Sequence, residues 1–265
     1  MSARFVVAAL AVLLVPSSAV AQDASLATQL AELMALQARV GDPDTRVRVA
    51  ATHRVWTIGL ASPSRDVKLT ALGLLGEPVG SSSDHIRMPA VYAIAEIANS
   101  TDDSQVKVRA LSMLREPLDA AQVPIRDVAI DAVNLITRGG KSDEVAGAAL
   151  GVLAAPVRSG NNGVRIPAIN AVVRAVEGSQ SDRACQTALD LLVSPLESDA
   201  MIGGLEVRMM AVRAVERVGL QASEVGTKAK AMGLLQSYAA RSGWEPEARA
   251  LAQQAAAAIQ NSLKP

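Results

Sequence analysis

Aromatic residues are scarce in this chain of 265 residues: Phe, Trp and Tyr together account for 2% of it, although half of the composition is hydrophobic. Beyond the N-terminal segment only Trp56, Tyr92, Tyr238 and Trp244 remain. Aromatic rings usually supply much of the buried area of a core. Without them the core must be built from Ala, Leu, Val and Ile, which favours thin helical layers packed close together.

The chain also lacks an excess of charge of either sign, because 26 basic residues balance 26 acidic ones. Nucleic-acid binding draws most of its affinity from Lys and Arg that neutralise phosphates, so DNA and RNA are not expected partners. The only cysteine, Cys185, cannot form an intramolecular disulfide. We expect it to be a small buried helix residue, with a reactive or intermolecular thiol as the alternative.

Motifs of catalysis and of metal binding are missing as well. The chain has two histidines, His53 and His85, and neither is followed by Glu. A histidine metal site needs several converging ligands, and a nucleophile such as Cys185 needs a base beside it, whereas His53 lies far away along the chain. No phosphate-binding glycine motif is present, and the Gly-Gly pairs at 139–140 and 203–204 indicate helix ends and turns. From the sequence we therefore expect no catalytic residue, no bound cofactor or metal, and no enzymatic activity.

The first 21 residues have the pattern of a secretory signal peptide. Arg4 precedes an apolar run from Phe5 to Val15, and small residues lead to Ala21. The run is too short for an uncleaved membrane anchor, which needs roughly 20 apolar residues. We expect cleavage before Gln22, a mature chain over 22–265 with no stable membrane insertion, and an exported protein that is periplasmic or secreted in a bacterium.

One pattern, Val/Ile-Arg-x-x-Ala-apolar, recurs along the mature chain. Counting its Val or Ile as place 1 defines a frame whose place 5 is always Ala: Ala51, Ala90, Ala129, Ala168 and Ala211. The steps between these alanines are 39, 39, 39 and 43 residues. A sixth, less regular copy is expected at Ala250, which puts Ala248 at an outer place of the last helix. Such a period is typical of a solenoid.

A second pattern with the same period lies between the copies of the first. It consists of Ala-Leu or Ala-Met pairs, and prolines follow four of the five: Pro78, Pro117, Pro156 and Pro195. The pattern predicts two helices per repeat, with each proline ending or kinking the first helix at one place.

Six pairs of helices are expected. They are 25–40 with the helix after Pro43, 64–77 with 84–99, 102–116 with 123–138, 142–155 with 162–177, 181–194 with 204–218, and 223–240 with 245–263. We expect Ser25 to cap the first helix and Gly41 to end it. The longer step before Ala211 predicts a four-residue insertion in the loop at 195–204.

The segment from Asp42 to Ala51, together with the recurring Val/Ile-Arg-x-x-Ala, resembles HEAT repeats of the short bacterial type, which also occur in phycobilisome-lyase-like proteins. The resemblance covers nearly all of the mature chain. It implies an all-α, right-handed solenoid of about six two-helix repeats of ~39 residues, whose second helices line a concave face and bind protein partners. Arg54 and Gln253, at place 8 of the first and last copies, are interpreted as polar substitutions in capping repeats.

Two rows of the frame differ in how constant they are. Place 2 is always Arg, in Arg48, Arg87, Arg126, Arg165 and Arg208. We expect these arginines to bond loop carbonyls or an acidic residue of the neighbouring repeat, and an anion-binding stripe is the alternative. Place 7 varies most, with His53, Tyr92, Asp131, Asn170 and Arg213. Helical geometry turns this row away from the core.

Apolar residues flank the variable row at places 3 and 10, among them Trp56, Met88 and Val173. They either meet a partner or fill gaps between neighbouring helices. The predicted partner-binding residues are His53, Trp56, Met88, Tyr92, Asp131, Asn170, Arg174, Arg213 and Arg217.

Three functions stay open from the sequence. The first is a non-enzymatic scaffold for an unidentified protein or peptide, with an acidic portion of the partner near Arg213 and Arg217. The second is a lyase-like or small-molecule-binding protein with a site near His53, Trp56 and Tyr92, which a closed apolar pocket with converging polar groups would favour. The third is a structural spacer.

Overall fold

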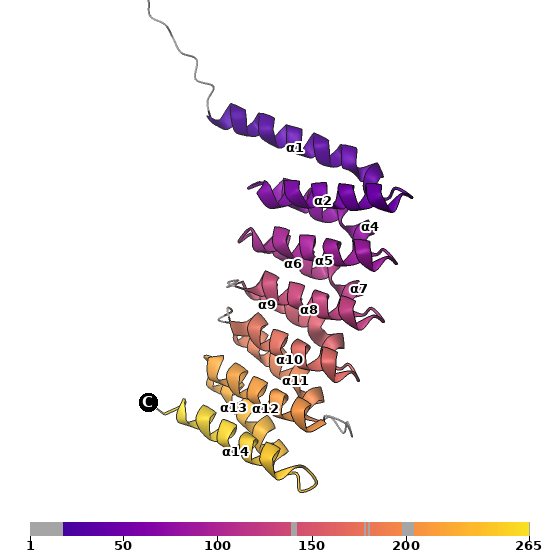
Figure 1. The fold of residues 1–265 in the computed structure, drawn as a ribbon. Helices are drawn as coiled ribbons and strands as arrows, with labels where there is room; N and C mark the ends of the chain where they lie inside the picture. The colour runs from indigo at the N-terminus through magenta and orange to yellow at the C-terminus, as the bar shows by residue number, and fades with distance from the viewer. Residues whose placement is uncertain (1–17, 139–141, 178, 180, 198–203, 265) are drawn as a thin grey trace, which may run out of the picture.

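The computed structural model describes residues 18–264 apart from 139–141, 178, 180 and 198–203, with side chains described from Ser25 onward. Over these ranges the chain forms fourteen helices and no strand. The helices stack from α1 at one end to α14 at the other (Figure 1). The expected signal peptide lies almost wholly outside the described residues, as does most of the expected insertion at 195–204. Among the described helices none is both long and apolar enough to span a membrane.

Twelve of the fourteen described helices form six pairs, beginning with α1 and α2, and the short helices α4 and α7 follow α3 and α6. Their bounds are α1 Ser18–Val40, α2 Thr45–Ala61, α3 Arg65–Leu74, α4 Gly76–Val79, α5 Asp84–Asn99, α6 Ser104–Met113, α7 Arg115–Leu118, α8 Val123–Thr137, α9 Asp143–Val157, α10 Asn162–Glu177, α11 Asp182–Leu196, α12 Gly204–Gln221, α13 Val225–Ala239 and α14 Pro246–Asn261. The bounds expected for the paired helices are confirmed to within a few residues. The exception is α1, which begins at Ser18, seven residues before the expected Ser25.

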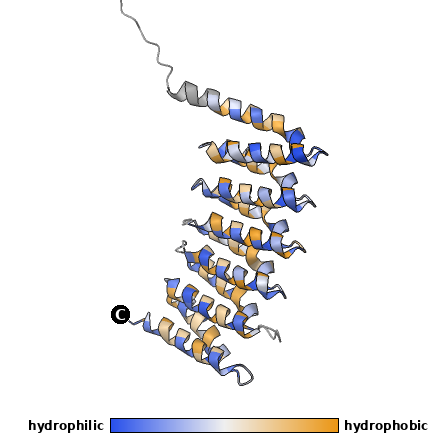
Figure 2. Cartoon of the chain, viewed as in Figure 1, coloured by the Kyte–Doolittle hydropathy of each residue, from blue (hydrophilic) through white to orange (hydrophobic). Residues whose placement is uncertain are grey.

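Two layers of helices make up the solenoid. The second helices α2, α5, α8, α10, α12 and α14 contact one another in this order, and the first helices α1, α3, α6, α9, α11 and α13 do the same behind them (Figure 1). Each helix carries both hydrophobic and hydrophilic residues (Figure 2), as expected of helices that bury one side. The all-α solenoid predicted from the repeats is confirmed.

The alanines at place 5 all belong to the buried core. Ala51 is 2% exposed, and Ala90, Ala129, Ala168 and Ala211 are fully buried. A small side chain at this place lets neighbouring helices approach, because a longer one would have to push a backbone aside. Ala and the β-branched residues around it thus supply the packing that aromatic rings supply in other cores.

The four repeated prolines all lie one residue before the end of a first helix. The helices end at Val79, Leu118, Val157 and Leu196, each directly after its proline. In the second and third repeats the helix is also interrupted at Leu75 and Leu114, so that α4 and α7 are separate short turns. The fourth and fifth repeats have no such break, because α9 and α11 continue through their prolines. The expectation that the chain changes direction in the same way after every first helix is therefore only partly right.

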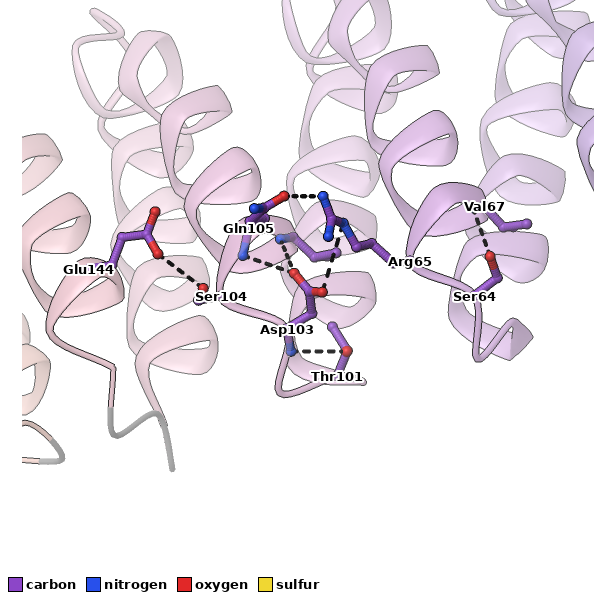
Figure 3. A network of polar contacts seen from close by, with 9 residues as sticks. Ser64, Arg65, Val67, Thr101, Asp103, Ser104, Gln105 and Glu144 are labelled. Atoms are coloured by element: carbon purple, nitrogen blue, oxygen red, sulfur yellow. Dashed lines mark hydrogen bonds and ion pairs between the residues drawn. The ribbon is translucent and has the colours of Figure 1, made fainter.

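Polar contacts join the N-terminal ends of successive first helices (Figure 3). Arg65 on α3 donates a hydrogen bond to Gln105 on α6, and its guanidinium lies 3.9 Å from Asp103. Ser104 donates to Glu144 on α9 at 3.0 Å. These contacts help to set how far each repeat is displaced from the next.

Three of the five arginines at place 2, Arg87, Arg165 and Arg208, join neighbouring repeats, as predicted. Arg87 donates to Glu116 of the next repeat at 2.7 Å, and its side chain is 9% exposed. Arg165 donates to the carbonyl of Ser194 in the next repeat at 3.1 Å. Arg208 forms an ion pair with the glutamate that precedes α14. Their burial and their partners identify the row as a structural one and disfavour an anion-binding stripe.

The last copy of the frame lies two residues later than the sequence analysis placed it. Ala250 is exposed, whereas Ala248 and Ala252 are fully buried. The Arg at place 2 and the Ala at place 5 match the earlier copies when Ala248 takes place 1, Arg249 place 2 and Ala252 place 5. Ala248 is therefore a core residue, and place 8 is the buried Ala255. The assignment of Gln253 to that place was wrong.

A pair of glycines gives independent support to this register. A Cβ atom on Gly59 would lie 2.7 Å from Ile97 Cδ1, and one on Gly219 would lie 2.6 Å from Ile259 Cδ1. Both glycines occupy place 13 of their copies, and Ile97 occupies place 12 of the next copy. Ile259 must then also be at place 12, which puts Ala248 at place 1. The extra two residues lie in the loop between α13 and α14.

Candidate binding surface

The variable row at place 7 lies on the outer side of the second helices. His53, Tyr92, Asp131 and Arg213 are exposed, Tyr92 by 48%, and Asn170 is half-buried. We call the exposed surface of α2, α5, α8, α10, α12 and α14 the second-helix face. The sequence therefore placed the row on the correct side of its helices.

The apolar residues beside this row are less exposed than the row itself. Val173 is 3% exposed, and Trp56, Met88, Ile166 and Met209 are half-buried and packed against the core. Val173 thus fills a gap between neighbouring helices. The other four fill such gaps in part and still present surface to the outside.

In the C-terminal half of the second-helix face, contacts between α10 and α12 fix the geometry. Arg217 on α12 forms an ion pair with Glu177 on α10. The side-chain amide of Gln221 donates to the carbonyls of Val176 and Glu177, at 2.9 Å in both cases. Because the C-terminal ends of the two helices meet in this way, the helices run parallel.

Arg174 on α10 and Arg213 on α12 each lie about one helical turn before a residue of this ion pair. Both are exposed, and within the described ranges neither has an ion pair or a side-chain hydrogen bond. Arg217, which the sequence grouped with them, is already paired. An exposed guanidinium group without an ion-pair partner attracts anions.

A pocket lies at the opposite end of the second-helix face, between α2 and α5. Its volume is about 400 Å³. The lining residues come from both helices: Val49, Thr52, His53 and Trp56 from α2, and His85, Ile86, Pro89, Tyr92, Ala93 and Glu96 from α5. The three residues of the predicted small-molecule site, His53, Trp56 and Tyr92, thus line one pocket.

Two polar atoms at this pocket are buried without a partner in the protein. They are the hydroxyl oxygen of Thr52, a residue that is 3% exposed, and Nε1 of Trp56. The ring of His53 contacts the Trp56 indole edge to face, with 5.1 Å between centroids. Leaving a buried donor without an acceptor costs about 1–3 kcal/mol, so these two groups mark a place that is incomplete on its own.

Both histidines of the chain line this pocket, which was not predicted from the sequence. They lie in different repeats and were therefore considered separately, but the second helices of adjacent repeats are direct neighbours. The signal was present, since His53 at place 7 faces outward and His85 directly precedes place 1 of the next copy. Over the described residues no group of three or more potential metal ligands occurs, so the histidines are not part of such a cluster.

Cys185 is 2% exposed, as expected of a buried helix residue. Burial, with a smaller contribution from Asp182, raises the pKa of its thiol to about 11. The thiolate is the reactive form, so the folded protein keeps this cysteine inert at neutral pH. The alternative of a reactive thiol is therefore disfavoured.

The chain matches no family model, and a search of curated proteins finds no match either. Solved structures do resemble it. An archaeal HEAT-like repeat protein from Thermococcus onnurineus NA1 is 15% identical, with a TM-score of 0.54 over 93% of this chain and 92% of that one. The N-terminus of TSC2 is 13% identical, with a TM-score of 0.60 over 87% of this chain and 62% of that one.

Designed armadillo repeat proteins are also similar. One, solved in complex with the peptide (KR)4, is 21% identical, with a TM-score of 0.54 over 88% of this chain and 100% of that one. At such identities the likeness concerns the fold alone. The chain thus has the architecture of HEAT and armadillo repeat solenoids.

Proposed function

We propose that this protein is an exported, non-enzymatic scaffold that binds a protein partner along its second-helix face. The observation that carries the proposal is that Arg174 and Arg213 on this face are both exposed and have no ion-pair partner among the described residues. An acidic segment of a partner would gain a charge-assisted contact with each of them. Its apolar side chains are expected towards the other end of the face, near Trp56, Met88 and Tyr92.

A contrast between repeats supports the same reading. Places that serve folding recur, because every repeat packs against nearly the same neighbour, and the buried alanines and the place-2 arginines do recur. Place 7 is exposed in His53, Tyr92, Asp131 and Arg213, half-buried in Asn170, and occupied by a different residue in each of these copies. A surface that meets a partner without internal repeats needs such variation, whereas a plain spacer does not.

The architecture suits this role. Solenoids present long continuous surfaces built from neighbouring repeats, and one of the similar designed proteins was solved with a bound peptide. That peptide is basic, whereas the pair Arg174 and Arg213 favours an acidic segment. The partner proposed here is therefore one of opposite charge at this end of the face.

The test is a capture experiment with matched charge reversals. The double variant Arg174→Glu and Arg213→Glu is compared with wild type as bait on the exported fraction of the source cells, and the bound proteins are quantified. We expect the amount of specific partner to fall at least ~10-fold, which corresponds to about 1.4 kcal/mol and exceeds the contribution of isolated surface charges. The melting temperature should stay nearly unchanged.

Two control variants distinguish a loss of binding from an effect of net charge and from an effect of stability. Arg109→Glu with Arg183→Glu changes the net charge by the same amount at exposed sites on first helices, and it should leave capture unchanged. Arg126→Glu alters the structural row, so it should lower the melting temperature first and capture only as a result. Equal capture by the Arg174/Arg213 variant and wild type would remove this face as the binding surface.

The proposal of export rests on residues 1–21, which have the pattern of a signal peptide. Cleavage before Gln22 would shorten α1 by four residues, 18–21. Among the side chains that the structure describes, from Ser25 onward, the first fully buried one of α1 is Leu33. Intact mass measurement of the protein from the periplasm or the medium tests the cleavage site, and a chain that stays in the cytoplasm at full length would contradict export.

A further inference from the structure

We propose that the pocket between α2 and α5 is a second binding site, which takes an uncharged, mainly apolar small molecule that carries a hydrogen-bond acceptor. This function goes beyond the proposed protein binding, since it concerns a different class of ligand, at the end of the second-helix face opposite Arg174 and Arg213. Trp56 and Tyr92 belong both to this pocket and to the apolar end of that face. Four features of the pocket support it: its size, its direction, its two unpartnered polar groups and its charge.

The size of the pocket suits a small molecule. Its volume of about 400 Å³ lies within the range of roughly 300–1,000 Å³ found for ligand sites. That volume exceeds what the side chain of any single amino acid would fill. Two of the four aromatic residues outside the N-terminal segment line it, together with both histidines, whereas the other two, Tyr238 and Trp244, pack on each other in the last repeat.

The direction of the pocket argues against a partner segment as its occupant. The lining residues of α5 extend from His85 in its first turn to Glu96, a distance of roughly 16 Å along the helix axis. The pocket thus runs parallel to the helices. A segment that follows the second-helix face crosses the helices instead, so it would pass over the pocket rather than fill its length.

The two unpartnered groups define the hydrogen-bonding character of the ligand. Thr52 and Trp56 are four residues apart on α2, so their side chains lie on the same side of the helix one turn apart. Nε1 of Trp56 can only donate, and the hydroxyl of Thr52 can donate as well. One acceptor atom on a ligand, such as a carbonyl oxygen, would satisfy both groups and remove the cost of burying them unpaired.

The charge of the lining favours a neutral ligand. The ten lining residues that the structure describes include no Lys and no Arg, and Glu96 lies at one end. A fatty acid or another anion would therefore find no Lys or Arg in the pocket and would be repelled by Glu96 at that end. A neutral ring system with one carbonyl group meets all four features.

The test uses two probes that differ only in the acceptor: 1-tetralone, a bicyclic ketone, and tetralin, the same bicycle without the oxygen. Each is titrated into the ¹⁵N-labelled full chain, and the indole N–H resonances are followed by NMR. The chain has two tryptophans, so the resonance that is lost in Trp244→Phe belongs to Trp244 and the other reports on Trp56. We expect 1-tetralone to shift the Trp56 resonance downfield in a saturable way, with an affinity at least ~10-fold above that of tetralin.

Two variants test the assignment of the site. Thr52→Val keeps the shape of the side chain and removes its hydroxyl, so it should weaken binding of 1-tetralone and leave tetralin unchanged. Val49→Phe fills the pocket from its rim, where Val49 is 40% exposed, and should abolish binding of both probes without loss of fold.

Three results would overturn the proposal. If neither probe shifts the Trp56 resonance at millimolar concentration, the pocket does not take small apolar molecules. Equal affinity for the two probes would refute the role of the acceptor. If an apolar peptide shifts the resonance while 1-tetralone does not, the pocket is an end of the protein-binding face rather than a separate site. None of these results depends on Arg174 or Arg213, so this proposal and the proposed function fail independently.

Discussion

Gly59 lies where two helical layers are in closest contact, and Gly59→Ala should destabilise the protein although alanine is the better helix former. A Cβ atom at this position would lie 2.7 Å from Ile97 Cδ1 and 2.8 Å from the Cβ of Ala71. Ile97 can change its rotamer, but the Cβ of Ala71 is attached directly to the backbone of α3 and cannot move away. Overpacking of this kind costs typically about 1–3 kcal/mol.

Helix propensity acts in the opposite direction and is smaller. Replacing Gly by Ala in a helix interior stabilises by ~1 kcal/mol, so we expect a net loss of up to about 2 kcal/mol in the free energy of unfolding. Urea titration followed by circular dichroism measures it. Gly73→Ala is the matched control: no atom lies within 4 Å of a Cβ there, so it should stabilise the protein by ~0.5–1 kcal/mol. If Gly59→Ala is as stable as Gly73→Ala, the layers are not in the contact described.

Three further predictions concern packing and titration. Ala129→Leu and Ala168→Leu, at fully buried sites, should each lower the free energy of unfolding by roughly 1–3 kcal/mol in the same urea assay. In the last repeat Ala252→Leu should be costly and the exposed Ala250→Leu nearly neutral, and the reverse order in thermal melts would refute the corrected register. Because burial raises the pKa of the Cys185 thiol to about 11, the native state holds its proton longer than the unfolded chain. Stability should therefore fall as the pH rises from about 9 to 11, more steeply in wild type than in Cys185→Ala.

The repeated residues explain why most of the fold could be predicted. Ala90, Ala129 and Ala168 occur at a fixed step, and each meets the same neighbours in its own repeat, so one helical pattern places them all in the core. The prediction was wrong where the period changes. Ala250 was chosen by extending a step of 39 residues, but the loop before α14 adds two, and Ala in place of Val or Ile at residue 248 hides the start of the copy.

The candidate sites could be predicted only in part. The position of His53 and Tyr92 at place 7 predicted that their side chains face outward, because helical geometry alone decides which side of a helix faces away from the core. The pocket volume depends instead on how two helices with few bulky residues pack, and no pattern in the sequence carries that information. Likewise the ion pair of Arg217 with Glu177 depends on how α12 is placed along α10, which leaves Arg174 and Arg213 without an ion pair among the described residues.

The central claim is that the second-helix face is the surface on which the partner lies, and site-specific photo-crosslinking in the source cells tests it most directly. A photoreactive residue replaces Asp131 or Arg213 on that face in separate experiments, and it replaces Ser112 or Thr187, exposed residues of first helices, in the controls. We predict a discrete crosslinked partner from positions 131 and 213 and none from 112 and 187. A partner band from the first-helix positions alone would contradict the account.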